Sequence, residues 1–258
     1  MFPSGTIFPF VVLITIAVSG IVTIIIGLRG RVFNLRRLSA VEALYPAVGR
    51  AVEMGGAVHW CMGTGRGRSI QDIAGQSAVS FLVLQRLARH CAKLGARLLP
   101  SLGQPEAVPL VDAICSQAFL AENVPQNWKS EDIGFFPESS YEVSIPLRLQ
   151  NENVKSNVMI GEFVSEAVII AESGVMAGAF QIGGTTAWNN IAYFVTTCDE
   201  FLIGEEIYAA GAYLSENPIE KSSLIGQDVA KFAMVLLMLI GVATVALGSQ
   251  ALVNLLKM

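Results

Sequence analysis

The chain has 258 residues, of which 53% are hydrophobic and only 15% are charged, and its formal net charge is −4. Soluble globular chains carry roughly 25% charged residues, so this composition indicates a membrane protein or a soluble domain joined to membrane segments. It excludes a disordered chain, a collagen-like repeat and a disulfide-dense secreted scaffold.

The apolar residues are concentrated at the two ends of the chain. No charged residue occurs in 7–28 or in 232–256, and each stretch exceeds the roughly 20 residues that a helix needs to cross a bilayer. We therefore predict two transmembrane helices, with residues 1–6 as a short external tail. The first stretch is too long for the apolar part of a signal peptide and no basic residue precedes it, which favours a retained helix.

Arginines set the expected orientation of the chain. Residues 1–6 carry no charged side chain, whereas the first apolar stretch is followed by Arg29, Arg31, Arg36 and Arg37. The positive-inside rule then places the region after the first helix in the cytoplasm. We expect a two-span protein of the cytoplasmic (inner) membrane with both termini outside, in which residues 29–228 form one cytoplasmic domain.

Charge is divided unevenly within this central region. Residues 29–97 hold 11 basic and 3 acidic residues, and residues 98–228 hold 4 basic and 18 acidic residues. The basic half suits anionic lipid head groups and the acidic half suits the cytosol or a neighbouring subunit; a basic pocket for a phosphorylated ligand is the alternative. The acidic bulk argues against nucleic acid as a partner.

Short apolar runs alternate with helical patterns through the central region. Strands are predicted at 58–62, 97–102, 133–136, 156–160, 179–182 and 201–203. Helices are predicted at 69–94, 106–121, 141–149, 165–177 and 187–197. Such alternation is typical of right-handed β-α-β units. The predicted fold is therefore α/β and Rossmann-like, with a mainly parallel, doubly wound sheet in a cytoplasmic domain flanked by two transmembrane helices.

Glycines follow several of the predicted strands. In an open parallel sheet the carboxyl ends of the strands share one edge, where ligands bind, and glycine allows close backbone approach there. The candidate ligand-binding residues are Gly63, Thr64, Gly65, Gly161, Gly183, Gly184, Thr185 and Gly204. Tight turns between strands and helices need glycine without any ligand, so both explanations stay open. Neither G-x-G-x-x-G nor a P-loop occurs in the chain.

Glutamates near the same strand ends are candidates for acid–base chemistry or for cation binding. They are Glu162, Glu166, Glu205 and Glu206. Glu162 and Glu166 also suit the start of a helix, where a negative charge is favourable without any catalytic role. No nucleophile elbow, H-E-x-x-H or kinase signature is present. An enzyme is therefore disfavoured, no metal site is assigned and no cofactor is identified.

Four cysteines are scattered without a C-x-x-C pair, at Cys61, Cys91, Cys115 and Cys198. A cytoplasmic domain does not form disulfides as a rule, and zinc sites need clustered ligands. Buried structural cysteines are therefore expected. His59 lies in a strand-like run and is expected to be a core or surface histidine rather than a ligand.

Several runs of the sequence carry a family resemblance. They are SNVMIGEF at 156–163, EAVIIAE at 166–172, QIGGT at 181–185 and the more specific LIGEEIYAAGAYL at 202–214, with VEMGG at 52–56 and GTG at 63–65. These runs resemble a prokaryotic membrane protein family catalogued as a domain of unknown function (DUF6754). The resemblance spans most of residues 40–235 and implies a membrane-flanked α/β domain, and it brings no activity or catalytic residues with it.

These features together predict a membrane-anchored structural or assembly subunit that is non-catalytic and homo-oligomeric. Its expected partners are the lipid bilayer, further copies of the chain and a larger membrane complex. Two glycine pairs seven residues apart, Gly20 with Gly27 and Gly241 with Gly248, give each apolar helix a face for close packing, either within one hairpin or between subunits. The alternative function is a membrane-tethered enzyme or sensor for a nucleotide-like or other phosphorylated small molecule.

Overall fold

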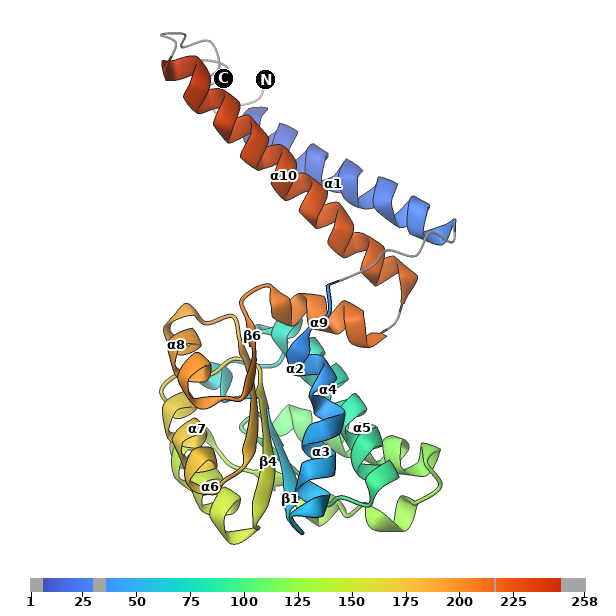
Figure 1. The fold of residues 1–258 in the computed structure, drawn as a ribbon, viewed down its shortest axis with the longest axis vertical. Coiled ribbons are helices and arrows are strands. Elements are labelled where there is room, and N and C mark those ends of the chain that lie inside the picture. Colours follow the sequence, from blue (N-terminus) through green and yellow to red (C-terminus); the bar gives the residue numbers. More distant parts are fainter. Residues whose placement is uncertain (1–6, 30–35, 216, 247–258) are drawn as a thin grey trace. The chain divides into compact units, whose positions relative to one another are not determined.

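The structure, a computed structural model, describes residues 7–29, 36–215 and 217–246 (Figure 1). The chain forms two compact units: one comprises Arg37–Leu214, and the other joins Met1–Arg36 to Ser215–Met258. The predicted external tail, Arg31 and residues 247–256 of the predicted second apolar helix, which include Gly248, lie outside the described residues.

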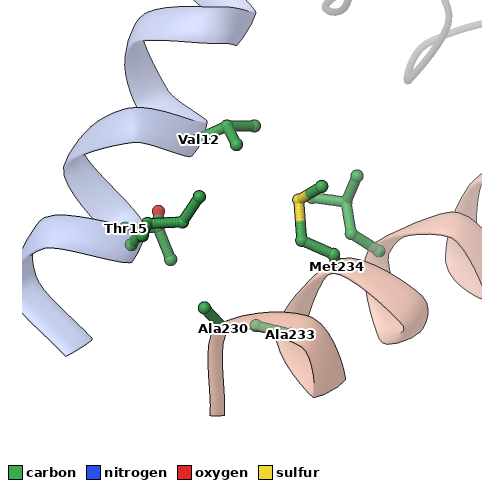
Figure 2. A pocket seen from close by; sticks show the side chains of 7 residues that line it. Val12, Thr15, Ala230, Ala233 and Met234 are labelled. Atoms are coloured by element: carbon green, nitrogen blue, oxygen red, sulfur yellow. The ribbon is translucent and has the colours of Figure 1, made fainter. Parts of the chain in front are cut away.

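Helices α1 (Ile7–Leu28) and α10 (Pro218–Ala246) pack against each other. A side chain at Gly226 of α10 would overlap Thr23 and Gly20 of α1, and the hydroxyl of Ser19 donates to the carbonyl of Gly226 at 3.1 Å. The small-residue face of α1 is therefore used inside the helix pair, against Gly226 and not against Gly241. A small cavity of about 70 Å³ remains further along the pair, beside Val12 and Met234 (Figure 2).

One of these helices has the length and apolarity of a membrane span. Within the described part of the chain, α10 alone is both long and apolar enough to cross a bilayer, judged by length and composition. The apolar stretch Val12–Leu28 of α1 is shorter. The structure thus supports one candidate span, and the predicted arrangement of two spans is not established by it.

The α/β unit is built on a six-stranded sheet in the order β3-β2-β1-β4-β5-β6. Every pair of neighbouring strands is parallel. The strands are β1 (Ala57–Cys61), β2 (Leu98–Leu102), β3 (Gly134–Phe135), β4 (Val154–Ile160), β5 (Phe180–Thr185) and β6 (Glu200–Ile203). The predicted α/β class with a parallel sheet is confirmed, and this strand order is that of doubly wound dinucleotide-binding folds.

Helices cover both faces of the sheet (Figure 1). The first face carries α2 (Ser39–Glu42), α3 (Leu44–Glu53), α4 (Ala74–Leu94), α5 (Val108–Ala121) and α9 (Glu206–Ser215). The second face carries α6 (Glu138–Asn151), α7 (Glu166–Met176) and α8 (Trp188–Thr197). Short 3-10 turns lie at Gly65–Gly67, Pro105–Ala107, Pro125–Asn127 and Ser130–Asp132. Because both faces are covered, the central strands are buried throughout, which explains their nearly continuous apolar sequences.

Each face has its own apolar core. Trp60 of β1 is fully buried on the first face, whereas Tyr141, Phe163 and Phe194 fill the second. Phe163 meets Phe194 edge to face, with ring centroids 5.4 Å apart. This contact ties the loop after β4 to α8, and it helps to fix that loop at the carboxyl edge of the sheet.

Two of the predicted boundaries that differ from the structure lie near the candidate site. Helix α4 begins at Ala74 and not at Ser69; Ser69 donates from its backbone N–H and its hydroxyl to Asp72 at 3.2 and 3.0 Å, but in a turn before the helix. Strand β5 continues to Thr185, so Gly183 and Gly184 lie inside the strand. Gly183 faces Phe194 and Cys198, where a side chain would collide. It is small because α8 packs closely on the sheet, not because of a turn. Helices α3 and α9 were not predicted.

Candidate functional site

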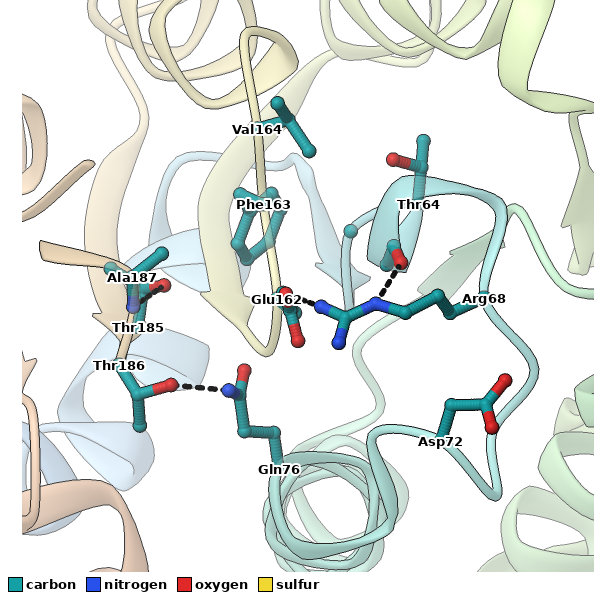
Figure 3. A network of polar contacts seen from close by, with 12 residues as sticks. Thr64, Arg68, Asp72, Gln76, Glu162, Phe163, Val164, Thr185, Thr186 and Ala187 are labelled. Atoms are coloured by element: carbon teal, nitrogen blue, oxygen red, sulfur yellow. Dashed lines mark hydrogen bonds and ion pairs between the residues drawn. The ribbon is translucent and has the colours of Figure 1, made fainter. Parts of the chain in front are cut away.

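The site lies where the strand order reverses. Strand β1 has β2 on one side and β4 on the other, and ligands of doubly wound sheets bind outside the carboxyl ends of the strands at such a switch point. We call residues 62–73, which follow β1, the first loop, and residues 161–165, which follow β4, the second loop. Figure 3 shows the two loops meeting at the beginning of α4.

The two loops are in direct backbone contact. The N–H of Gly65 donates to the carbonyl of Glu162 at 3.1 Å. A side chain at Gly63, whose φ is +79°, would overlap that same carbonyl, and one at Gly161 would overlap the carbonyl of Met62. Gly63 and Gly161 therefore allow a close backbone approach, and the two segments that approach each other are the first and the second loop.

Glu166 joins the loops through its carboxylate. Its Oε1 accepts hydrogen bonds from the N–H and the hydroxyl of Thr64 at 3.1 and 2.7 Å, and its Oε2 accepts from the N–H of Val164 at 3.0 Å. The side chain is buried, with 2% of its surface exposed. Backbone N–H groups at this position hold the phosphates of nucleotides in related folds. Here one of them is occupied by a carboxylate of the chain itself.

A second carboxylate pairs with Arg68 of the first loop. Arg68 forms an ion pair with Glu162, and its Nε donates to the carbonyl of Gly65 at 3.1 Å (Figure 3). Glu162 is 9% exposed. Both glutamates of the predicted pair thus lie at the switch point, and each has a partner in the first loop.

A cavity of about 210 Å³ opens beside this ion pair. Its lining includes Arg68, Asp72, Gly75, Gln76, Glu162 and Tyr208. The amide nitrogen of Gln76 donates to the hydroxyl of Thr186 (Figure 3), while its Oε1 is buried and accepts no hydrogen bond. Helix α4 begins at this cavity without a side-chain cap. Polar groups with unused bonding capacity therefore converge here.

The other predicted site residues have local partners. Gly204, with φ +57°, lies in the turn after β6, where Glu206 accepts a hydrogen bond from the N–H of Ile203 at 3.2 Å. The hydroxyl of Thr185 accepts from the N–H of Ala187 at 3.1 Å. Glu206 thus caps the start of its own helix, and Glu205 precedes that helix. These contacts support the turn explanation for this part of the edge.

The comparison with protein families is decisive. The family model DUF6754, described as a domain of unknown function, matches residues 1–256. The chain belongs to this family. The resemblance seen in the sequence is confirmed, and the match takes in both the helix pair and the α/β unit of this DUF6754 protein. Searches of the curated proteins and of the solved structures found no match.

Sequence reasoning missed a row of buried polar side chains across the sheet of the DUF6754 protein. The Nδ1 of His59 lies 2.8 Å from Oδ1 of Asn157, its Nε2 lies 2.9 Å from the hydroxyl of Ser101, and the amide nitrogen of Asn157 donates to Gln181 at 2.9 Å. The guanidinium of Arg148 donates to Ser101 at 3.0 Å. Burial lowers the pKa of His59 to about 3. These groups satisfy one another, which indicates a structural role.

The remaining nucleophilic and metal-binding groups are buried or dispersed. All four cysteines are buried, as predicted. Burial raises the pKa of Cys61 and of Cys91, and raises that of Cys198 to about 12, so these thiols stay protonated at neutral pH. Within the described residues no three His, Cys, Asp or Glu side chains are grouped to hold a metal ion.

Proposed function

We propose that this protein is a membrane-anchored assembly subunit whose α/β unit works through protein contacts and not through catalysis. The observation that carries the proposal is the closed switch point. The carboxylate of Glu162 pairs with Arg68, and that of Glu166 accepts from the N–H of Thr64. These carboxylates would repel a nucleotide phosphate at this position, because like charges repel strongly in a site of low dielectric.

The state of the reactive side chains supports the same proposal. A catalytic cysteine acts as the thiolate, and a general base needs a pKa near the working pH. The thiols of Cys61 and Cys198 have raised pKa values, and His59 has a pKa near 3 with both ring nitrogens bonded to neighbours. None of these groups is poised for acid–base or nucleophilic work.

The helix pair supports the membrane anchor. Large apolar side chains are exposed all around the second half of α10; Phe232, Leu239 and Val242 are 75%, 63% and 69% exposed. A helix that is apolar on every side is stable when lipid covers it. We propose that α10 and α1 both insert in the cytoplasmic membrane, with both chain ends outside and the α/β unit in the cytoplasm.

The outer surface of the second-face helices supports a protein partner. Val143 and Leu147 of α6 and Ile169 of α7 are 62%, 53% and 41% exposed, and Trp188 at the start of α8 is 85% exposed. Exposed apolar side chains in such number mark contact surfaces, and tryptophan is prominent among residues that dominate binding. We propose a homo-oligomer or a larger membrane complex as the assembly.

Native purification tests the assembly proposal. The full chain, extracted in mild detergent, is expected to elute as an oligomer or with partner proteins, and Trp188→Ser with Leu147→Ser is expected to release the monomer. Glu53→Gln, an exposed change at the end of α3 on the other face of the sheet, is the control that is expected to leave the assembly intact. A chain that is monomeric by light scattering with lipids retained, and that brings no partner with it, contradicts the proposal.

A second candidate function is a membrane-tethered sensor, favoured by the cavity beside Arg68 and Glu162. Its volume of about 210 Å³ lies below the roughly 300 to 1,000 Å³ of pockets that hold drug-sized ligands. A ligand that this cavity encloses completely is therefore smaller than a typical drug-sized molecule. A sensor of this kind is compatible with an assembly role, because a bound ligand can strengthen or weaken protein contacts.

A further inference from the structure

We propose that copies of this protein associate head to tail, with the outer surface of α6, α7 and α8 of one copy packed against the outer surface of α3 and α4 of the next. This inference rests on the assembly function proposed above, and it names a second copy of the chain as the partner. The two surfaces cover opposite faces of the sheet (Figure 1). One copy cannot bring them together, so the contact forms between copies.

The first surface, which we call the acidic surface, combines exposed apolar side chains with negative charge. It consists of Glu142, Val143 and Leu147 of α6, Ile169 and Glu172 of α7, and Trp188 of α8. The hydroxyl of Ser165, the residue before α7, donates to Glu142 at 2.7 Å and joins α6 to the start of α7. Ile169 and Glu172 are three residues apart and lie on the same side of α7.

Positive charge is missing from the outward side of these helices. Their one cation is Arg148, whose guanidinium points inward and donates to the carbonyl of Pro100 at 2.9 Å and to the hydroxyl of Ser101 at 3.0 Å. Glu166 is buried. The remaining charged residues of α6, α7 and α8 are all acidic: Glu138, Glu142 and Glu172.

The second surface, which we call the basic surface, consists of Tyr45 of α3 and of Arg86, Arg89 and Lys93 of α4. The three cations are spaced at i, i+3 and i+7, so they lie on one side of the helix. Tyr45 is 50% exposed, and its ring meets that of His90 edge to face with centroids 5.1 Å apart. The tyrosine therefore lies beside the cations of α4.

Acidic groups near the basic surface do not cancel its charge. Glu122 lies 3.7 Å from Lys93, and both side chains of this pair are partly exposed. Such a pair contributes little and is screened by salt. Glu53 is at the opposite end of α3 from Tyr45. The charged side chains of α3 and α4 are otherwise basic: Arg50, Arg86, Arg89 and Lys93.

Charge complementarity selects the head-to-tail arrangement. Two acidic surfaces in contact would place Glu142 and Glu172 against like charges, and two basic surfaces would do the same with arginines. Like charges facing each other across an interface oppose association, whereas opposite charges guide it. Tryptophan, tyrosine and arginine, which the two surfaces supply, are the residues that dominate binding energy. A contact between two different surfaces is heterologous, so it builds a ring or an open row of copies.

Charge reversal tests the contact in the full chain, extracted in mild detergent and measured by light scattering. Glu142→Arg with Glu172→Arg reverses the acidic surface, and Arg89→Glu with Lys93→Glu reverses the basic surface. Each pair of changes alone is expected to raise the dissociation constant of the oligomer by about tenfold or more. A chain that carries all four changes is expected to regain assembly, because its two surfaces again have opposite charge.

The recovery also separates the contact from folding, since a misfolded variant does not regain assembly through a second pair of changes. The matched control is Lys129→Glu with Glu131→Lys, which reverses two exposed charges before β3 on neither surface. It is expected to leave assembly unchanged. Raising the salt concentration shortens the Debye length from about 10 Å at 0.1 M to about 3 Å at 1 M, and it is expected to weaken the native oligomer.

The outcomes separate this inference from the assembly proposal. Assembly that is lost in the two-change chains and not regained in the four-change chain overturns the head-to-tail contact. Unchanged assembly in both two-change chains overturns the contact and leaves the assembly proposal standing on another surface. Assembly that forms only after phosphatidylglycerol is added assigns the basic surface to anionic lipid and overturns the contact. A native chain that is monomeric and brings no partner with it contradicts both proposals.

Discussion

At the scale of single residues, His59 shows how burial and hydrogen bonding fix one chemical form. Its ring is fully buried between Asn157 and Ser101, and the guanidinium of Arg148 reaches the same serine. The carbonyl oxygen of Asn157 can only accept, so the Nδ1 of His59 carries the proton and its Nε2 accepts from Ser101. A neutral imidazole therefore completes the row, and a second proton finds no acceptor.

This arrangement predicts a loss of stability in acid. The folded pKa of His59 is about 3, below the ordinary value of 6.5, so the unfolded chain binds the proton first as pH falls. The stabilisation is complete above pH 6.5 and is lost between pH 6.5 and pH 3, at a rate of up to about 1.4 kcal/mol per pH unit.

Unfolding midpoints between pH 7 and pH 5 test the expectation. His59→Gln removes the titrating group, and its midpoint is expected to be lower at pH 7 but less dependent on pH. His90, whose pKa partial burial lowers to about 4, contributes with the same sign, so His90→Gln is the comparison. An unchanged pH dependence in His59→Gln contradicts the assignment.

At the scale of elements, the helix pair is defined by small residues. Gly226 lies against Thr23 and Gly20, and Gly27 lies against Ser222. In lipid no hydrophobic effect drives two helices together, so close backbone contact and van der Waals packing decide whether they associate. The contact uses the part of α10 before its fully apolar stretch, which the seven-residue glycine spacing did not indicate.

Two glycine-to-alanine substitutions in the helix pair test whether close contact at Gly226, and not glycine content alone, holds the helices together. Gly226→Ala places a methyl group against α1 and is expected to loosen the pair, whereas Gly20→Ala meets open space and is expected to leave it intact. The measurement is the rate of cross-linking between cysteines introduced as Val12→Cys and Met234→Cys, which flank the small cavity between α1 and α10 (Figure 2). Equal rates in both alanine variants contradict the described packing.

At the scale of the whole molecule, the charge beside the apolar helices predicts the orientation. Arg29, Arg36 and Arg37 follow α1 within the described residues, and basic residues near a span stay on the cytoplasmic side. A reporter inserted near Gln126, which is exposed, is expected to be cytoplasmic, and one fused after the last residue is expected to be external.

Neutral replacements provide the control for orientation. Changing the four arginines Arg29, Arg31, Arg36 and Arg37 to glutamine is expected to produce mixed reporter signals, because the charge asymmetry is lost. Four arginine-to-glutamine changes at other, exposed positions of the α/β unit are expected to leave the orientation unchanged. A cytoplasmic signal from the terminal reporter of the unaltered chain contradicts the two-span arrangement.

The sequence by itself determined the α/β class and the order of most elements in this protein. Runs such as Val58–Met62 and Val158–Ile160 are mostly apolar and short because the central strands are covered on both faces and bury nearly every side chain. Local composition is enough for such elements. It was not enough at Ser69, where a turn imitates a helix start, or at Gly183, where a glycine serves helix packing.

Only the tertiary structure decided which side chains meet. His59 and Asn157 are 98 positions apart in the chain, and Thr64 and Glu166 are 102 apart. Parallel strands joined through helices bring such residues together by their register, and no local pattern records that register. The closed switch point and the polar row across the sheet therefore became visible only in the folded chain.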